Sequence, residues 1–359
     1  MVNSAYFFPG ANSYKGFFSY FDNIISPKAA KKIYVIKGGP GTGKSTFMRK
    51  IGNYLNEKGY FVEYFHCSSD VDSLDGICIP ELGIAFIDGT APHVIDPVYP
   101  GAVDEIINLG DYFDVCKLEK DRESIININN EISEQFKNAY SVLRAINSYK
   151  EILLRIEEKY ISEGYLNKLY ENICQQIFGY ARVSYRKGQR RKLFLSAITP
   201  QGFQSFIKEN AKRFYNVFVI NSEFESSLQI LNKIMDYAIE RGFDVEMFYC
   251  GFNPKKLEHL AIPELSTFII TSNRYHTITD STFNNIKVDF DKAFNGADRE
   301  LFNEVNLHIS NEFVKVINFL KKAKGLHDEL EKFYIQAMDF DSVENKFKEV
   351  CDELESFII

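Results

Sequence analysis

The chain has 359 residues, a formal net charge of −7, 45% hydrophobic residues and 25% charged residues. This length predicts two domains, and the composition is that of a globular protein rather than a disordered or fibrous one. The negative charge disfavours a large nucleic-acid-binding surface, so we do not expect a nucleic-acid motor.

The apolar stretches and the cysteines indicate the cellular compartment of the protein. No stretch of 18 apolar residues occurs, and residues 1–8 lack a basic segment followed by a long apolar run. We therefore expect no membrane span and no signal peptide. The six cysteines are scattered without C-x-x-C spacing. They predict reduced thiols and a cytoplasmic location.

The first predicted elements lead to a phosphate-binding motif. A helix over Phe17–Ile25 precedes the short β-prone run Lys32–Ile36, which predicts a buried strand. The next residues match G-x-x-x-x-G-K-[ST], the P-loop pattern. They are Gly38, Gly39, Pro40, Gly41, Thr42, Gly43, Lys44, Ser45 and Thr46. Apolar residues at helical spacing follow, so the motif lies between a strand and a helix.

The residue types of this motif suit phosphate binding. Glycines allow backbone N–H groups to turn toward an anion, and the N-terminus of the following helix adds partial positive charge. We expect Lys44 to contact the β- and γ-phosphates of a nucleotide and the Ser45 hydroxyl to bind Mg²⁺. A purely structural glycine-rich turn is the alternative, which the length of the motif and its flanking elements disfavour.

Polar residues follow the next predicted strands, over Phe61–Phe65 and Ile84–Ile87. The second of these strands ends in Asp88, the pattern of a Walker B carboxylate that holds Mg²⁺ through water. The residues between the two strands are predicted to form a polar loop, with three members as a candidate second-substrate loop: His66, Asp70 and Asp75. Open α/β sheets place their binding crevice at such strand ends, although loop aspartates often only cap turns.

His93 lies five residues after Asp88. It is either a packed, hydrogen-bonded histidine or a residue that contacts the γ-phosphate or a second substrate.

The chain contains an internal duplication. The sequence GYFVEYFHC at 59–67 reappears as GFDVEMFYC at 242–250, and Ile79–Leu82 reappears as Ile262–Leu265. The offset is 183 in both cases, because 242 − 59 and 262 − 79 are equal. The second copy therefore repeats the predicted elements of the first, with a helix over Phe203–Phe214 and strands over Asp244–Phe248 and Phe268–Ile270.

The duplication defines the predicted domains. The first is 1–182 with a helical stretch over 121–178, the second is 193–359 with a helical stretch over 298–357, and a basic linker, 183–192, joins them. Alternating strands and helices predict an α/β fold in which each copy has a parallel sheet covered on both faces, followed by a helical hairpin. The sequence leaves open whether each hairpin packs on its own copy. We interpret the linker as a solvated segment rather than a binding site.

The second copy has lost the P-loop. Its counterpart, Asn221–Ser227, has no glycine and carries two glutamates that would repel phosphate. Thr271 stands opposite Asp88, and Glu258 stands opposite Asp75. We therefore predict one nucleotide site per chain, in the first copy, with the second copy as a pseudo-domain. His276, the counterpart of His93, is retained.

These motifs resemble those of the P-loop NTPase superfamily. The sequences KGGPGTGKST at 37–46, HCSSD at 66–70 and DGTAPH at 88–93, in a duplicated chain, are similar to a family of bacterial ATP-binding proteins. The resemblance covers the whole chain and implies ATP binding and a RecA/AAA-like core. Gly89 follows Asp88 where many ATPases have a glutamate, so the usual catalytic glutamate is not identified and slow hydrolysis is expected.

Three functions follow from these observations. The first is a Mg²⁺-dependent ATP hydrolase, slow or stimulated by a protein partner of unknown identity, with Arg274 of the second copy as an arginine finger. The second is a small-molecule or nucleotide kinase in which the candidate second-substrate loop orients an acceptor hydroxyl. The third is a non-catalytic ATP-dependent switch or scaffold.

Overall fold

The computed structural model describes residues 3–90, 94–160, 162–179, 181, 183, 185–221, 229–278, 284–287 and 296–358. The chain divides into two units. Unit 1 comprises residues 1–10, 19–138 and 318–359, and unit 2 comprises residues 11–18 and 139–317. These units do not coincide with the contiguous copies defined by the duplication, because segments from each half of the chain contribute to both units.

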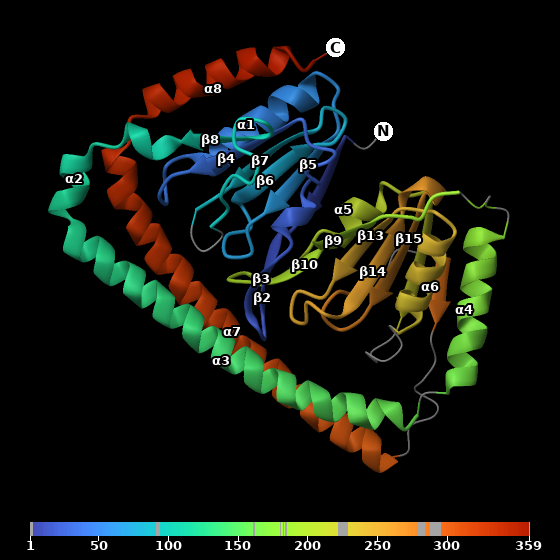
Figure 1. Cartoon of the computed structure of the whole chain (residues 1–359). Helices are drawn as coiled ribbons and strands as arrows, with labels where there is room; N and C mark the ends of the chain where they lie inside the picture. The colour runs from blue at the N-terminus through green and yellow to red at the C-terminus, as the bar shows by residue number, and fades with distance from the viewer. Residues whose placement is uncertain are drawn as a thin grey trace. The chain divides into compact units, whose positions relative to one another are not determined.

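Unit 1 is built on a six-stranded mixed sheet of order β1-β5-β6-β7-β4-β8 (Figure 1). Its strands are β1 (Ser4–Phe7), β4 (Lys32–Lys37), β5 (Val62–His66), β6 (Leu74–Ile79), β7 (Ile84–Asp88) and β8 (Asp104–Asn108). β6 is antiparallel to both of its neighbours, and the other pairs are parallel. The three strands predicted for this copy are confirmed.

The prediction of a wholly parallel sheet is wrong because β6 was taken for part of a polar loop. A tight turn joins β6 to β7, with Gly83 at φ 69° and its N–H bonded to the Pro80 carbonyl. Two strands joined by so short a turn must run antiparallel. The interior Asp75 and Gly76 weakened the strand pattern, yet every residue of β6 is buried.

Helices from both ends of the chain cover the unit 1 sheet. α1 (Lys44–Glu57) packs on β5 and β6. α8 (Phe340–Glu355) packs on α1, and its buried residues Val343, Val350 and Leu354 join the same hydrophobic core. The remaining helical elements here are η1 (Phe21–Asn23), η2 (Leu109–Tyr112), α2 (Val115–Lys120) and parts of α3 (Arg122–Glu158) and α7 (Gly296–Ala337).

Unit 2 has a sheet of the same design, of order β9-β13-β14-β15-β12-β16. Its strands are β9 (Arg190–Phe194), β12 (Asn216–Asn221), β13 (Val245–Tyr249), β14 (Leu257–Ile262), β15 (Thr267–Ser272) and β16 (Asn284–Lys287). Strand directions match those of unit 1 pair by pair, and β14 is again antiparallel to its neighbours. Register shifts occur at the matching positions Phe65/His66 and Phe248/Tyr249.

The helices of unit 2 include one from the first half of the chain. α6 (Gln229–Glu240) packs on β13 and β14, and α4 (Glu163–Phe178) packs on α6. The Phe178 ring lies 5.1 Å from the Tyr237 ring, measured between centroids. The two terminal helices are therefore exchanged: α4 closes the first half but packs in unit 2, whereas α8 closes the second half but packs in unit 1.

Two other predicted segments differ in the structure. The helices expected over 17–25 and 203–214 are replaced by short hairpins followed by single turns. The hairpin strands are β2 (Gly10–Ser13), β3 (Gly16–Ser19), β10 (Ser196–Thr199) and β11 (Gly202–Ser205), and α5 (Ile207–Ala211) follows β11. Gly16 and Gly202 take φ values of 98° and 101°, which favour glycine at these turns.

The basic linker is shorter than predicted, because β9 begins at Arg190 and pairs with β13. Arg186 contacts Asp244 at 2.5 Å and Glu264 at 2.7 Å, and Arg190 contacts Asp236 at 2.9 Å. These positive charges are thus balanced by acidic residues of unit 2.

No helix within the described residues is long and apolar enough to cross a membrane.

Candidate functional site

The P-loop sequence forms the turn between β4, which ends at Lys37, and α1, which begins at Lys44. Gly41 and Gly43 have φ values of 69° and 87°, which favour glycine at both positions. Gly43 is the N-cap residue of α1, and no side chain caps this helix. The first N–H groups of α1 are therefore left without the usual side-chain acceptor, the arrangement that helix N-termini use to bind anions.

Lys44 and Asp88 lie together beside this turn. The Lys44 Nζ donates to the Gly38 carbonyl at 3.0 Å and to the Gly39 carbonyl at 2.8 Å, and it lies 3.6 Å from an Asp88 carboxylate oxygen. β4 and β7 are parallel and pair with Ile36 opposite Asp88. The P-loop turn that follows β4 and the Asp88 side chain therefore lie at the same edge of the sheet.

The two predicted magnesium ligands offer oxygen atoms. Ser45 Oγ accepts a hydrogen bond from the Leu74 N–H at 3.0 Å, and an Asp88 oxygen accepts from the Thr90 N–H at 2.8 Å. A hydroxyl and a carboxylate are hard ligands of the kind that Mg²⁺ prefers. Asp88 also accepts from the Thr90 hydroxyl, and each residue keeps lone pairs beyond the bonds it already accepts, so these residues fit the ion.

Asp75 belongs to the same group of side chains, but it does not lie in a loop as predicted. It is a buried residue of β6 whose charge interacts with those of Asp88 and Lys44. Burial, followed by the negative charge of Asp88, raises the pKa of Asp75 to about 8. Asp75 therefore carries a proton at neutral pH, and a carboxyl whose pKa is strongly shifted beside other charged groups is typical of functional sites.

This shift predicts a pH dependence of stability. Between about pH 5 and pH 7 the folded chain keeps the Asp75 proton and the unfolded chain does not, so the free energy of unfolding falls as the pH rises. The contribution is about 1.4 kcal/mol per pH unit. Asp75→Asn should remove it, as measured by urea unfolding at pH 5, 6 and 7. Asp72→Asn, on the exposed turn nearby, should keep the parent slope; equal slopes for parent and Asp75→Asn would contradict the shifted pKa.

His66 and Asp70 have structural partners of their own. His66 ends β5, and its Nδ1 lies 2.6 Å from the Val71 carbonyl oxygen; burial lowers its pKa. Asp70 accepts a hydrogen bond from the Ser73 hydroxyl at 3.0 Å and forms an ion pair with Lys324 at 3.3 Å. The three residues of the candidate second-substrate loop therefore do not share one loop: His66 and Asp70 stabilise the turn after β5, and only Asp75 interacts with Lys44.

The remaining candidates fall outside this group. His93 lies outside the described residues, as do positions 222–228 of the predicted degenerate loop. Arg274 belongs to unit 2, where it lines a pocket with His276. Its role as an arginine finger stays a prediction.

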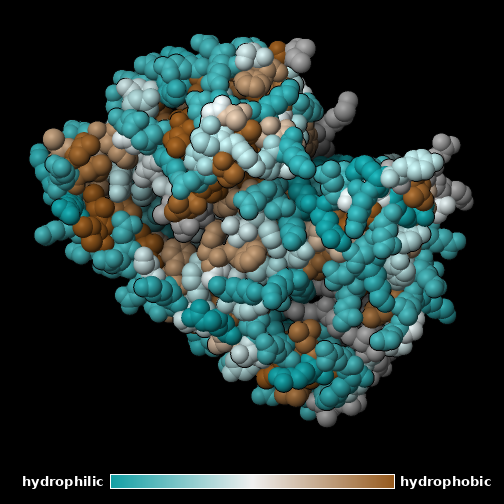
Figure 2. All heavy atoms as spheres, viewed as in Figure 1, coloured by the Kyte–Doolittle hydropathy of each residue, from teal (hydrophilic) through white to brown (hydrophobic). Residues whose placement is uncertain are grey.

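No pattern in the sequence indicated a helix against the P-loop. A Cβ atom placed on Gly39 would lie 2.8 Å from Tyr334 Cε1, and one on Gly41 would lie 2.9 Å from Ile335 Cγ1. The last turns of α7 thus cover this part of the loop. Unit 1 also exposes the apolar residues Val115, Ile126, Ile335 and Phe340. Figure 2 shows apolar residues gathered over α2.

Because α7 lies so close to the loop, a smaller side chain on α7 should offset the stability loss caused by a larger one in the loop. Gly39→Ala should clash with the Tyr334 ring and lower the free energy of unfolding by about 1–3 kcal/mol. Tyr334→Ala in the Gly39→Ala background should recover most of that loss, as measured by chemical denaturation. Matched losses with and without Tyr334 would show that the ring does not contact the loop. Gly325→Ala, where nothing lies within 4 Å of the added atom and φ is likewise not positive, is the control for an added methyl group without a clash.

Comparison with known proteins gave one result. A family model described as Nephrocystin 3, N-terminal, matches residues 19–77, a stretch that includes β4, the P-loop turn, α1 and β5. No curated protein and no solved structure matches the chain. The chain is thus similar over this short stretch to the N-terminal region of nephrocystin 3.

Proposed function

We propose that unit 1 binds Mg·ATP at the P-loop and hydrolyses it slowly. The observation that carries this proposal is the placement of Lys44 and Asp88, 3.6 Å apart, beside an uncapped helix N-terminus and a glycine turn. Glycine turn, lysine, hydroxyl and carboxylate together are the parts that P-loop enzymes use.

Each residue has a defined task in this proposal. The N–H groups of residues 41–46 bind phosphate oxygens, and Lys44 exchanges its contacts with the Gly38 and Gly39 carbonyls for the β- and γ-phosphates. Ser45 and Asp88 hold Mg²⁺, the ion that offsets the charge of the transferred phosphoryl group. Asp75, protonated at neutral pH, adds a neutral acid rather than a third negative charge beside Asp88.

We further propose that the two halves of the chain, each of which supplies one six-stranded sheet, are a tandem duplication of one P-loop NTPase domain. The shared strand order, the matching strand directions and the matching register shifts support this interpretation. The second copy then kept the sheet and lost the phosphate-binding turn, so one Mg²⁺-dependent site per chain is expected.

A nucleotide-dependent switch is the second candidate, and the contact of α7 with the P-loop favours it. Tyr334 lies close to Gly39, and Ile335 lies close to Gly41. Movement of the loop on binding phosphate would therefore displace α7. Under this alternative Mg·ATP changes the position of the helix and turnover is not required.

Calorimetric titration and phosphate release test both candidates on the full chain. Mg·ATP should bind at one site, and EDTA should weaken that binding. Phosphate release above the buffer rate supports hydrolysis, whereas binding without release supports the switch. Absence of Mg·ATP binding would contradict both.

A further inference from the structure

Unit 2 contains a pocket at the sheet edge that corresponds to the nucleotide edge of unit 1. Its floor is formed where β13 and β15 end and β14 begins, and its wall includes Lys150 of α3 and Asn306 of α7. The pocket encloses about 800 Å³ of empty space, part of it open to solvent. The space into which water-sized groups fit is about 60 Å³, so a nucleotide would extend through the open side of the pocket.

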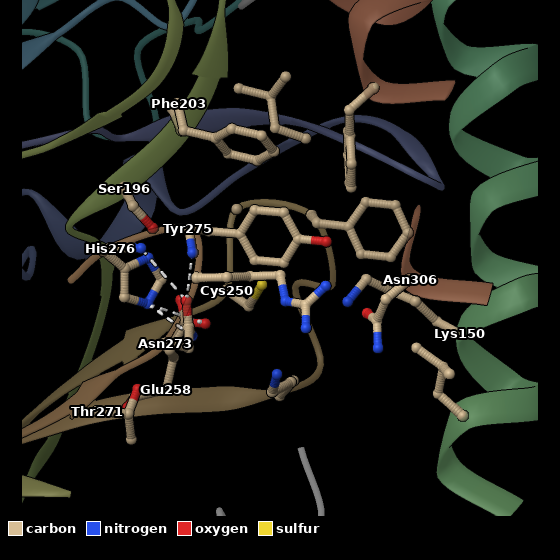
Figure 3. Close-up of a pocket in the computed structure, with 18 of the residues that line it drawn as sticks. Lys150, Ser196, Phe203, Cys250, Glu258, Thr271, Asn273, Tyr275, His276 and Asn306 are labelled. Atoms are coloured by element: carbon tan, nitrogen blue, oxygen red, sulfur yellow. Dashed lines mark hydrogen bonds and ion pairs between the residues drawn. The ribbon is translucent and has the colours of Figure 1, made fainter. Parts of the chain in front are cut away.

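The buried carboxylate Glu258 lies at one side of this pocket (Figure 3). The residue is 2% exposed, and its Oε2 has no hydrogen-bond partner within the described part of the chain. Burial by itself would raise the pKa of Glu258, but its interactions with His276 and then with Lys256 and His259 hold that pKa well below the ordinary value. A buried ionised carboxylate with an unused oxygen calls for a donor.

The neighbouring histidines do not make this a metal site. Ligand atoms of Glu258, His259 and His276 all lie within 4.8 Å of one another, which is close enough for a shared ion. However, His259 Nδ1 accepts the Thr271 N–H at 3.1 Å, and burial lowers the pKa of His259, so its ring is neutral. The ring hydrogen must then be on Nε2, the atom that faces Glu258 at 3.9 Å. A protonated Nε2 cannot bind a metal.

The pocket has a second pole of positive charge. Lys150 and Arg274 line the pocket together with the buried carboxylate Glu157, whereas Lys256 acts on Glu258 at the first pole. The Lys150 ammonium lies 5.4 Å from the Tyr275 ring centroid, and Figure 3 shows the Tyr275 ring between Lys150 and the pair Glu258 and His276. A ligand that spans the pocket would meet the Glu258 carboxylate at one side and the Lys150 ammonium at the other.

Aromatic rings form the wall between the two poles. The Phe203 ring lies 4.8 Å from the Tyr275 ring and 4.9 Å from the Phe313 ring, measured between centroids. Phe203 and Tyr275 are partly exposed, so a flat ligand can pack on them. Such surfaces bind planar heterocycles by stacking.

We propose that unit 2 binds a purine nucleoside monophosphate in this pocket, with N–H groups of the base donating to Glu258 and the phosphate facing Lys150. The base packs on Tyr275 and Phe203. No phosphate-binding turn is needed, so this mode of binding is compatible with the loss of the P-loop in the second copy.

Unit 1 offers a parallel. Glu258 and Asp75 are separated by 183 positions, the offset of the duplication, and each is a buried carboxyl near the start of an equivalent strand, β14 or β6. In unit 1 the acid lies beside Lys44 and Asp88, whereas in unit 2 it lies beside two histidines. The acid therefore persists where the P-loop does not, which supports a separate ligand for unit 2.

Calorimetric titration of the full-length Lys44→Ala variant in EDTA tests the proposal without relying on the Mg·ATP site. GMP, whose base presents two kinds of N–H donor on one edge, should bind at one site. Glu258→Gln, which keeps the shape and removes the charge, should weaken GMP binding at least tenfold, and Glu304→Gln on an exposed face of α7 should not. Guanosine, which lacks the phosphate, should also bind at least tenfold more weakly than GMP.

A second variant covers the case in which Glu258→Gln fails to fold. Lys150→Met should weaken GMP binding at least tenfold but leave guanosine binding unchanged, whereas Lys168→Met, exposed on α4, should change neither. The proposal is overturned if neither GMP nor AMP binds, or if inorganic phosphate binds as tightly as GMP. It is also overturned if the parent chain holds one zinc ion that Glu258→Gln releases.

Discussion

Lys44→Ala is expected to lower ATP turnover by at least about 100-fold and to weaken Mg·ATP binding at least tenfold. A charged donor aimed at developing phosphate charge contributes on the order of 100-fold to turnover. In the structure the Lys44 Nζ contacts the carbonyls of Gly38 and Gly39 and lies 3.6 Å from Asp88, so it is already positioned at the P-loop turn. Titration calorimetry and single-turnover phosphate release measure the two losses.

Lys50→Ala is the matched control for this variant. Lys50 lies on the same helix, α1, but its ammonium pairs with Glu344 at 2.5 Å on the exposed side. Loss of such a surface pair costs at most about 1 kcal/mol of stability and should leave nucleotide binding intact. If Lys44→Ala binds Mg·ATP as well as Lys50→Ala does, the P-loop is not the nucleotide site.

The two strands that carry the proposed site could be predicted from the local sequence pattern. The β-prone run before Gly38 and the apolar run ending in Asp88 each marked a strand, and both strands are present. β6 was not predicted because Asp75 and Gly76 interrupt its apolar pattern. Without β6, the antiparallel strand pairs of the sheet could not be predicted either. Asp75 was named as a candidate, but its burial and its raised pKa depend on neighbours that are remote in sequence.

The contacts made by the terminal helices could not be predicted in the same way. The spacing of Val343, Val350 and Leu354 shows that α8 has an apolar face but does not show which surface covers it. Amphipathic helices of the two copies are interchangeable in pattern, so nothing local distinguishes packing on α1 from packing on α6. Tyr334 was overlooked for the same reason, since its contact with Gly39 joins residues almost 300 positions apart.

Leu354→Ala is expected to lower the free energy of unfolding of unit 1 by about 2–5 kcal/mol, although Leu354 is near the end of the chain. Leu354 is fully buried in the core that contains Phe47, Met48 and Leu55 of α1. Its truncation leaves a cavity between α8 and α1. Leu301→Ala removes the same atoms from a residue that is 42% exposed on α7, and it should cost no more than about 0.5 kcal/mol.

Amide hydrogen exchange on the full chain locates each effect. It also tests whether α8 packs in unit 1 and α4 in unit 2. Leu354→Ala should speed exchange in α1 and leave α6 unchanged. Phe178→Ala, at the end of α4, should do the reverse, because Phe178 is buried against Tyr237 and Phe243 in unit 2. A fragment that ends near residue 185 would lack α8 altogether and could not report on the P-loop unit. Faster exchange in α6 after Leu354→Ala, with α1 unaffected, would mean that each terminal helix packs on its own copy.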